Sequence, residues 1–514
     1  MRQSMAKKNI ILSGFVILKF VLQYLLIDAG YDLHRDEYLH LDQAAHLAWG
    51  FQSVPPVTSC ISTLIFLLGG SVFWVKFFPA LFGALTLVMV WKAVEELDGN
   101  LFALVLSVTG ILFSTLLRIN TLYQPNSFDI LSWTAFYLIL IKYFKTERPK
   151  WLYVAALVFG IGFLNKYNIL FLLTGLIPAI LLTKQRKIFA VKDLYFALIA
   201  GLLCVLPNLI WQYKNDFPVF QHLHELAETQ LVYTDRADFL KSQIFFFIGS
   251  FVVILSALYA LLFYKPFEKY KPFFWSIIIT LVIFLYFKAK SYYATGLYPI
   301  YISFGSVFLG NILNKGWVRY FFKPVLIILP VLFFMLMYNF AFPNKSPEYI
   351  VNHPQKYHKY GMLRWEDGEL HTLPQDFADM LGWKALAAKV DSVCSELPNL
   401  DNTFILCDNY GQAGAINFYS ENKKVIAHSY SVDYINWLPL DMKIINVILV
   451  KETCHDADRD RNQEVPLFDT VYLATQRINQ YAREDTISVY VLKDAKADIN
   501  KIIKEDVNRR KHKK

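Results

Sequence analysis

The sequence predicts a polytopic α-helical membrane protein with a soluble α/β domain at its C-terminal end. The chain has 514 residues, of which 55% are apolar and 18% charged, with a mean hydropathy of +0.34. Soluble domains carry about 25% charged residues. Apolar runs follow one another as far as Pro343, and ordinary soluble composition follows. We therefore expect a membrane domain, 1–342, and a soluble domain, 343–514.

The membrane domain is expected to contain about eleven transmembrane helices, since a span needs roughly 17–25 predominantly apolar residues. The expected spans are Ile10–Ile27, Phe73–Val94, Leu101–Leu117, Ile130–Ile141, Leu152–Leu164, Ile169–Leu182, Tyr195–Trp211, Ile244–Phe263, Phe273–Phe287, Ala294–Ile312 and Val325–Phe340. The shorter run Val57–Gly70, after Pro55-Pro56, is interpreted as a helix in the membrane interface. No small-residue cleavage site follows the first span, which indicates an uncleaved anchor.

The charges of the loops predict the orientation in the membrane. Three or more Lys or Arg residues occur in each of four alternate loops: Lys142–Lys150, Lys184–Lys192, Tyr264–Lys271 and Asn314–Lys323. The positive-inside rule assigns such loops to the cytoplasm. With eleven spans, the C-terminal domain would lie on the outer face of the cytoplasmic (inner) membrane. The net charge of +9 is mostly in these loops and the terminal NRRKHKK. Membrane lipids, and no nucleic acid, are the expected partners.

The soluble domain alternates strand-like and helical patterns, which predicts a small α/β fold. Strands are expected at Thr403–Asn409, Ile444–Val450 and Thr486–Leu492, and helices at Ala385–Leu397, Gln412–Tyr419 and Phe468–Tyr481. The charged last dozen residues are expected to be disordered. Cys394, Cys407 and Cys454 leave room for at most one disulfide.

A set of charged residues lies outside the basic loops, near the expected outer surface. Its members are Arg35, Asp36, Glu37, Arg118, Asp129, Lys166, Lys288 and Lys290. Charge close to a membrane is costly and usually functional. Cations mixed with acids suit a phosphate-bearing substrate and general-base chemistry. Each residue alone also fits a local ion pair, a helix-start charge or a snorkelling side chain, and Tyr292 and Tyr293 fit an interfacial aromatic belt. Because all of these residues are expected at the same outer surface, a functional site is favoured over separate local roles.

A further cluster lies in the long outer loop, where Gln221–Gln230 reads QHLHELAETQ. His222, His224 and Glu225 could bind a divalent metal, but their spacing matches no zinc signature. A metal site, a substrate-binding loop and a solvated helix remain open alternatives, and no cofactor is assigned with certainty.

The run DLHRDEYLHLDQAAHLAWGFQSVPPV, residues 32–57, resembles the first outer loop of the bacterial family 39 glycosyltransferases. These belong to the GT-C class, which includes protein O-mannosyltransferases and the aminoarabinose transferases of lipid A. The resemblance continues through FPALFGA (78–84), FLNKYNIL (163–170), KAKSYYATGLYP (288–299) and NYGQAGAINFY (409–419). It covers nearly the whole chain and implies the GT-C fold. The NYGQAGAINFY segment would pack against the membrane domain or meet the acceptor, and packing is favoured.

The resemblance also implies a reaction. A sugar would pass from a polyprenyl-phosphate donor to a lipid, glycan or protein acceptor on the outer face, with inversion at the sugar. Asp36 would be the general base and Glu37 a supporting acid. The donor phosphate would be held by Lys166, Lys288 and Lys290 with help from Arg118. The other substrate-binding candidates are Arg35, Asp129, Tyr292 and Tyr293. Many relatives carry a charged residue before the proline pair, where this chain has Ser53 and Val54.

Two other classes of function are weighed against a transferase. A transporter or lipid flippase usually places charge near the bilayer midplane, at broken helices of related halves. Here the charges gather at one surface and the halves do not match. A non-catalytic scaffold would tolerate changes at Asp36 and would depend on the tail, 344–514.

Overall fold

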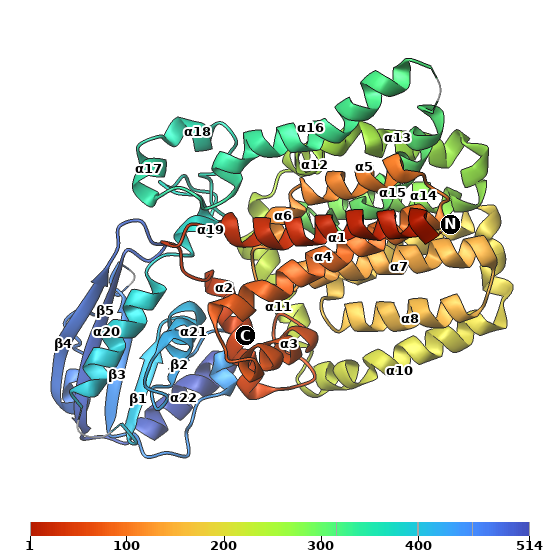
Figure 1. Ribbon diagram of the computed structural model, residues 1–514. Coiled ribbons are helices and arrows are strands. Elements are labelled where there is room, and N and C mark those ends of the chain that lie inside the picture. The colour runs from red at the N-terminus through yellow and green to blue at the C-terminus, as the bar shows by residue number, and fades with distance from the viewer. Residues whose placement is uncertain (1, 315, 398–399, 455, 513–514) are drawn as a thin grey trace.

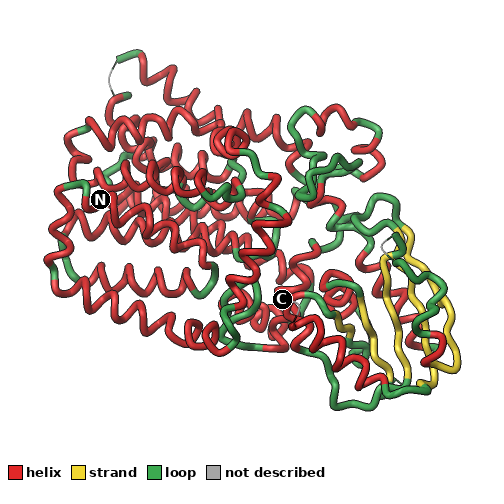
Figure 2. The backbone as a smooth tube through the Cα atoms, turned by 180° about the vertical axis from the view of Figure 1, so that it is seen from behind, coloured by secondary structure: helices red, strands yellow, loops and turns green. Residues whose placement is uncertain are grey.

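The computed structural model describes residues 2–314, 316–397, 400–454 and 456–512. A bundle of helices forms the larger part, and a β-sheet with its own helices lies at one end of that bundle (Figures 1 and 2). The first helix, α1 (Arg2–Leu25), starts at the far end of the bundle and runs toward the sheet. The last bundle helix, α16 (Val318–Ala341), leads into the C-terminal part.

Every expected span is helical in the structure, although several are short or broken. The bundle helices after α1 are α4 (Val72–Glu96), α5 (Leu101–Leu112), α6 (Leu116–Ile119), α7 (Asn126–Thr146), α8 (Lys150–Phe163), α9 (Leu170–Leu181), α10 (Lys192–Lys214), α12 (Arg236–Phe246), α13 (Phe251–Phe263), α14 (Lys271–Tyr286), α15 (Tyr298–Ile312) and α16. In the described part of the chain, six helices are long and apolar enough to cross a membrane, or eight if each of two bent pairs is one span. The number is below eleven because helices such as α15 are short and buried among their neighbours.

The basic loops meet one another at one end of the bundle. Lys145 lies 3.1 Å from Asp98, and Lys187 lies 2.5 Å from Glu147. Lys184 donates a hydrogen bond to Glu268 at 2.7 Å. The length of α7 separates this end from the loops around its first residue, so the basic loops and the other charged loops lie at opposite ends, as the sequence predicted.

Two short helices cover the bundle at the end that faces the sheet. They are α2 (Arg35–Asp42) and α3 (Val57–Leu67). The apolar helix α3 corresponds to the run expected in the interface, and it ends where Gly69 and Gly70 adopt positive φ angles of 107° and 63°, which glycine accommodates without steric cost.

The C-terminal part is built on a five-stranded sheet of order β2-β1-β3-β5-β4. The strands are β1 (Thr403–Cys407), β2 (Ala427–Ser429), β3 (Asn446–Glu452), β4 (Phe468–Ile478) and β5 (Thr486–Ala495). β1 pairs in parallel with β2 and β3, and β5 pairs antiparallel with β3 and β4. Helices α20 (Trp383–Ser395) and α21 (Tyr410–Tyr419) pack on one face and α22 (Ile499–His512) on the other. The expected α/β fold is confirmed.

Two local predictions for this part were wrong. The segment expected as a helix at Phe468–Tyr481 is strand β4, which pairs with β5 along its length because its sequence places Thr, Val and Tyr in an extended stretch. The last residues, expected to be disordered, form α22 as far as His512. Ile499, Ile503 and Val507 recur every four residues and bury one face of this helix against the sheet. Residues 513 and 514 lie outside the described chain.

The cysteines form no disulfide among the described residues. Cys394 and Cys407 are buried in the C-terminal part as separate thiols. The one pair that the sequence allowed is therefore absent from this structure.

One hydrophobic core runs from the first loop of the bundle into the C-terminal part. Leu33 and Tyr38, which flank the start of α2, are buried together with Trp383 and Leu386 of α20 and with Ile448 of β3. Burial of apolar surface stabilises by about 25 cal/mol per Å², so this shared core fixes the position of the C-terminal part on the bundle.

Candidate active site

The geometry of the first loop is set by the start of α2. The His34 side chain accepts a hydrogen bond from the backbone N–H of Asp36 at 3.2 Å, and the Glu37 carboxylate accepts from the backbone N–H of His34 at 2.5 Å. This reciprocal arrangement is a capping box. Glu37 also accepts from the backbone N–H of Tyr123 at 2.6 Å and is 1% exposed. The supporting acid expected at Glu37 therefore has backbone partners, and it holds α2 against the bundle.

Asp36, the expected general base, faces an accessible space. Its Oδ1 accepts from the Tyr410 hydroxyl at 2.7 Å, and its Oδ2 accepts from the Gln124 amide at 3.2 Å. The side chain is 42% exposed. A carboxylate offers about four acceptor positions, so further positions remain for a substrate hydroxyl.

The surroundings of Asp36 favour its ionised form. Burial alone would raise the pKa of the carboxyl, but His34, the hydrogen bond from Tyr410 and the Arg35 charge outweigh this effect and lower the pKa of Asp36 below its usual range. Asp36 is thus a carboxylate at neutral pH, as a proton acceptor must be.

The hydroxyl that reaches Asp36 belongs to the first residue of α21, which packs closely along α2. A Cβ added to Gly411 would lie 2.6 Å from the Arg35 side chain, and one added to Gly414 would lie 2.6 Å from Cβ of Tyr38. Only glycine at these positions permits the approach. The Arg35 guanidinium lies over the Tyr410 ring, 4.5 Å from its centroid, a cation–π contact. The NYGQAGAINFY segment therefore packs on the first loop and also contributes a side chain to Asp36.

A second group of expected residues gathers around Lys166. Its ammonium donates to Asn126 at 2.6 Å and lies 5.3 Å and 4.5 Å from the ring centroids of Tyr292 and Tyr293. Burial lowers the pKa of Lys166 to about 8, against the opposing effect of Asp129. A lysine with this pKa is available to bind an anion, which would favour its charged form.

Asp129 lies behind this group and does not face the open space. It is 4% exposed and accepts hydrogen bonds from Trp133 at 3.0 Å and from Asn168 at 2.8 Å. Asn168 also donates to the carbonyl of Tyr293 at 3.0 Å. Asp129 therefore positions the Lys166 group from within α7.

Electrostatic interactions connect Asp36 with the Lys166 group. Burial raises the pKa of Tyr292 far above its usual value, and the charge of Asp36 contributes to the rise. Burial lowers the pKa of His40, whose imidazole responds to both Asp36 and Lys166. The predicted base and the predicted phosphate-binding lysine thus act on the same neighbouring side chains at one end of the bundle.

Two further predicted cations, Lys290 and Arg118, line a cleft of about 520 Å³ beside this group. Lys290 pairs with Glu366 at 2.6 Å, and Arg118 pairs with Asp376 at 3.1 Å. Both acids come from the segment 361–377, which follows the bundle and forms the other wall of the cleft. The two predicted phosphate ligands therefore face acids in this structure.

Lys288 is separated from these cations. It follows the end of α14, where the backbone bends with a φ of 51°, and its carbonyl accepts from Thr234 at 2.9 Å. Among the described residues that line the cleft, Lys290 is present and Lys288 is not. The structure brings together Asp36, Lys166, Tyr292 and Tyr293, with Arg118 and Lys290 in the adjoining cleft.

The metal candidates lie on α11 (Pro218–Thr229), a largely exposed helix. His224 lies 3.2 Å from Glu228 on this helix. Within the described ranges, no group of three or more His, Cys, Asp or Glu side chains could hold a metal ion. His222, His224 and Glu225 thus form no metal site in this structure.

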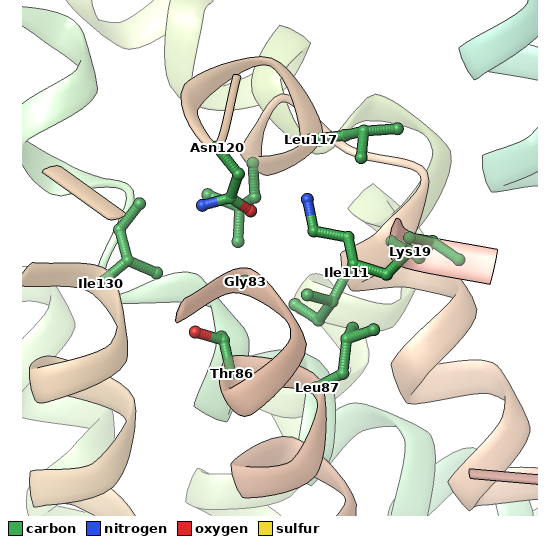
Figure 3. A pocket seen from close by; sticks show the side chains of 10 residues that line it. Lys19, Gly83, Thr86, Leu87, Ile111, Leu117, Asn120 and Ile130 are labelled. Atoms are coloured by element: carbon green, nitrogen blue, oxygen red, sulfur yellow. The ribbon is translucent and has the colours of Figure 1, made fainter. Parts of the chain in front are cut away.

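The sequence did not point to Gln124 or to the hydroxyl of Tyr410, and it placed Lys19 within an ordinary span. Lys19 is 2% exposed and donates to Gln23 at 2.5 Å. Its side chain and that of Asn120 point into a small space beside α4 (Figure 3). That cavity holds about 10 Å³, room for about one water molecule, and the hydrogen bond from Lys19 to Gln23 stays within α1.

Comparisons with known proteins show what the chain is similar to in sequence and in fold. Residues 53–211 match the family model described as dolichyl-phosphate-mannose-protein mannosyltransferase. The chain is 25% identical over 328 residues to the lipid A galacturonosyltransferase RgtD of Rhizobium johnstonii, a match that covers 60% of this chain. It spans 66% of that relative's length, just under two thirds.

Two solved structures are similar over almost the whole chain. ArnT of Cupriavidus metallidurans in the apo state has a TM-score of 0.63 at 12% identity and covers 95% of this chain and 98% of ArnT. The same protein bound to undecaprenyl phosphate has a TM-score of 0.61 at 12% identity and covers 93% of this chain and 97% of ArnT. At this identity the likeness concerns the fold.

The comparisons thus show a fold like that of ArnT, and parts of the chain are similar to a mannosyltransferase family model and to a galacturonosyltransferase. The matched mannosyltransferase model agrees with the resemblance to family 39 that the first loop carries.

Proposed function

We propose that the chain transfers a sugar from a polyprenyl-phosphate donor to a lipid or glycan acceptor, with inversion at the anomeric carbon and Asp36 as the general base. The observation that carries this proposal is the ionised, accessible carboxylate of Asp36, which shares one end of the bundle with three cations. The cations are Lys166, Lys290 and Arg118. The donor class is supported by the structural likeness to a protein bound to undecaprenyl phosphate.

In this proposal the cleft beside the Lys166 group receives the donor phosphate. The acceptor hydroxyl approaches Asp36 and gives up its proton to the carboxylate. The acceptor oxygen bonds to the anomeric carbon while the bond from that carbon to the phosphate oxygen breaks, and polyprenyl phosphate leaves with the electron pair. Ammonium and guanidinium groups stabilise the charge that grows on the phosphate.

The acceptor is proposed from the relatives. A match to a lipid A galacturonosyltransferase along 60% of the chain favours a lipid or glycan of the lipid A kind. The mannosyltransferase model, which matches 53–211, would favour a protein acceptor. We also propose that the site lies on the outer face of the cytoplasmic membrane, because the basic loops gather at the opposite end of the bundle.

The test is mass spectrometry of cell-envelope lipids, glycans and proteins from cells that lack this chain and are complemented with variants. Wild type should restore one hexose, hexuronic acid or pentose unit on a lipid or glycan. Asp36→Asn keeps the size of the side chain but removes the base, and we expect the transfer rate to fall by about 10²–10⁴-fold.

The matched control is Asp28→Asn, which changes an exposed acid in the same loop and should restore the product fully. Native transfer by Asp36→Asn would refute the assignment of the base. Counterflow of a labelled lipid in proteoliposomes without any covalent product would instead support a transporter.

A further inference from the structure

A second cavity lies next to the candidate active site and has no part in the chemistry described above. It has a volume of about 200 Å³ and is lined by the loop 420–426, by the ends of α2 and α21, and by residues of η1 (Gln43–His46), β2 and η8 (Val432–Asn436). We call it the side pocket. Its volume corresponds to roughly seven water molecules at about 30 Å³ each, which is enough for one small polar ligand.

The wall of the side pocket carries hydrogen-bonding groups of little net charge. Asp42 accepts from the Asn417 amide at 2.6 Å and from the Tyr434 hydroxyl at 2.5 Å. Burial raises the pKa of Asp42 to about 7 and lowers the pKa of His428 to about 4. The His428 imidazole is therefore neutral at physiological pH. Lys423, a cation at the rim, donates to a backbone carbonyl at 3.3 Å.

Aromatic rings complete the wall. The His46 ring stacks on Trp437 with a centroid distance of 4.3 Å and an interplanar angle of 9°, and Tyr434 lies 4.9 Å from Trp437. A phosphate would need several cations, whereas Lys423 is the one Lys or Arg among the described residues that line the pocket. A pyranose has C–H groups on its faces and hydroxyls around its edge, so neutral donors and acceptors beside aromatic rings match it.

The position of the side pocket relates it to the transfer site. Asp36 and Asp42 lie on one helix, six residues apart, which is about 9 Å along the axis at 1.5 Å per residue. Their partners Tyr410 and Asn417 lie in the same order on α21, so the two helices run in parallel from one site to the other. An acceptor that reaches both sites needs about the length of two linked sugars.

From this juxtaposition, we propose that the side pocket binds a sugar unit of the acceptor glycan, adjacent to the unit whose hydroxyl meets Asp36. The proposal rests on the proposed function for the identity of the acceptor. Binding of a sugar in the side pocket can be measured without any transfer reaction.

The experiment is saturation-transfer NMR of the full chain in nanodiscs with a panel of methyl glycosides of hexoses, N-acetylhexosamines, hexuronic acids and 3-deoxy acidic sugars. Ala45→Trp and Ile426→Trp fill the side pocket from exposed positions without removing a hydrogen bond. Lys424→Trp is the matched control, because residue 424 is exposed close by and does not line the pocket. We expect at least one glycoside to bind with a Kd in the millimolar range and to lose about fivefold or more of its signal in both filling variants.

The signal should persist in Lys424→Trp and in Asp36→Asn, and addition of undecaprenyl phosphate should leave it unchanged, which separates an acceptor sugar from the donor. With a competent acceptor, the filling variants should raise KM for the acceptor and leave kcat near wild type. The proposal is overturned if no glycoside binds, if the filling variants bind like wild type, or if undecaprenyl phosphate displaces the glycoside. Sugar binding without transfer would overturn the proposed function alone.

Discussion

The Tyr410 hydroxyl donates a 2.7 Å hydrogen bond to the carboxylate of Asp36, although 374 residues separate them in the chain. Tyr410 begins α21 in the C-terminal part, whereas Asp36 lies in the first loop of the bundle. The C-terminal part therefore supplies a contact to the proposed base. It is more than an appendage to the bundle, because the protonation of Asp36 depends on it.

Replacing Tyr410 by Phe should move the acidic limb of the pH–rate profile. The hydrogen bond from this hydroxyl lowers the pKa of Asp36, so its removal raises that pKa. A base is active when ionised, and activity is lost as the pH falls through its pKa. We expect the acidic limb to shift upward by up to about one pH unit, since the site is partly open to solvent.

The control for this variant is Tyr419→Phe, which removes a hydroxyl from the same helix at a distance from Asp36. Its hydroxyl accepts from the backbone N–H of Leu33. An acidic limb that stays in place in Tyr410→Phe would show that the hydrogen bond does not tune the base.

Deprotonation of Lys166 should weaken donor binding at alkaline pH. The pKa of this lysine is about 8 in the unliganded protein, and the ammonium is lost as the pH rises through that value. We expect undecaprenyl phosphate to bind the wild-type protein more weakly above about pH 8. Lys166→Arg keeps its charge throughout this range, so its affinity should not fall between pH 7 and 9. If the affinity for undecaprenyl phosphate depends on pH equally in the two proteins, Lys166 does not bind the phosphate.

Glu366 should compete with the donor phosphate for Lys290. The two side chains lie 2.6 Å apart at the mouth of the cleft, where Glu366 is 45% exposed. A partly exposed pair contributes about 0.2–1 kcal/mol. Glu366→Gln should therefore strengthen the binding of undecaprenyl phosphate by about two- to fivefold, whereas Glu369→Gln, at an exposed neighbour, should have no effect. Weaker binding in Glu366→Gln would mean that the acid supports the donor site.

The close packing of α2 on α21 should be disturbed by a side chain at position 414, which is Gly414. A Cβ here would lie 2.6 Å from Tyr38 and 2.7 Å from the Tyr434 hydroxyl, and overpacking of this kind costs about 1–3 kcal/mol. We expect Gly414→Ala to lower the apparent midpoint of thermal unfolding in detergent by several degrees. Gly14→Ala, where nothing lies within 4 Å of the new methyl group, should not lower it. Identical melting of the two variants would contradict the packing argument.

The sequence pointed to most residues of the candidate site as a group, but it did not show how their side chains are arranged. The charged residues outside the basic loops predicted a site at one end of the bundle, and Asp36, Lys166 and Lys290 do lie at that end. The same pattern also selected Lys288 and Glu37, because charge alone does not show which way a side chain points. Glu37 accepts hydrogen bonds from the backbone of His34 and Tyr123, and no local sequence pattern reveals the contact with Tyr123.

The sequence by itself determined where the helices lie and how the chain divides between membrane and soluble composition, because apolar content and its period are properties of neighbouring residues. It could not identify β4 as a strand, because β4 depends on pairing with β5. It also did not show that α22 is a helix docked on the sheet. Only the tertiary structure decided that Tyr410 meets Asp36 and that acids face Lys290 and Arg118. These contacts join segments hundreds or tens of residues apart, and packing between distant elements sets their energy.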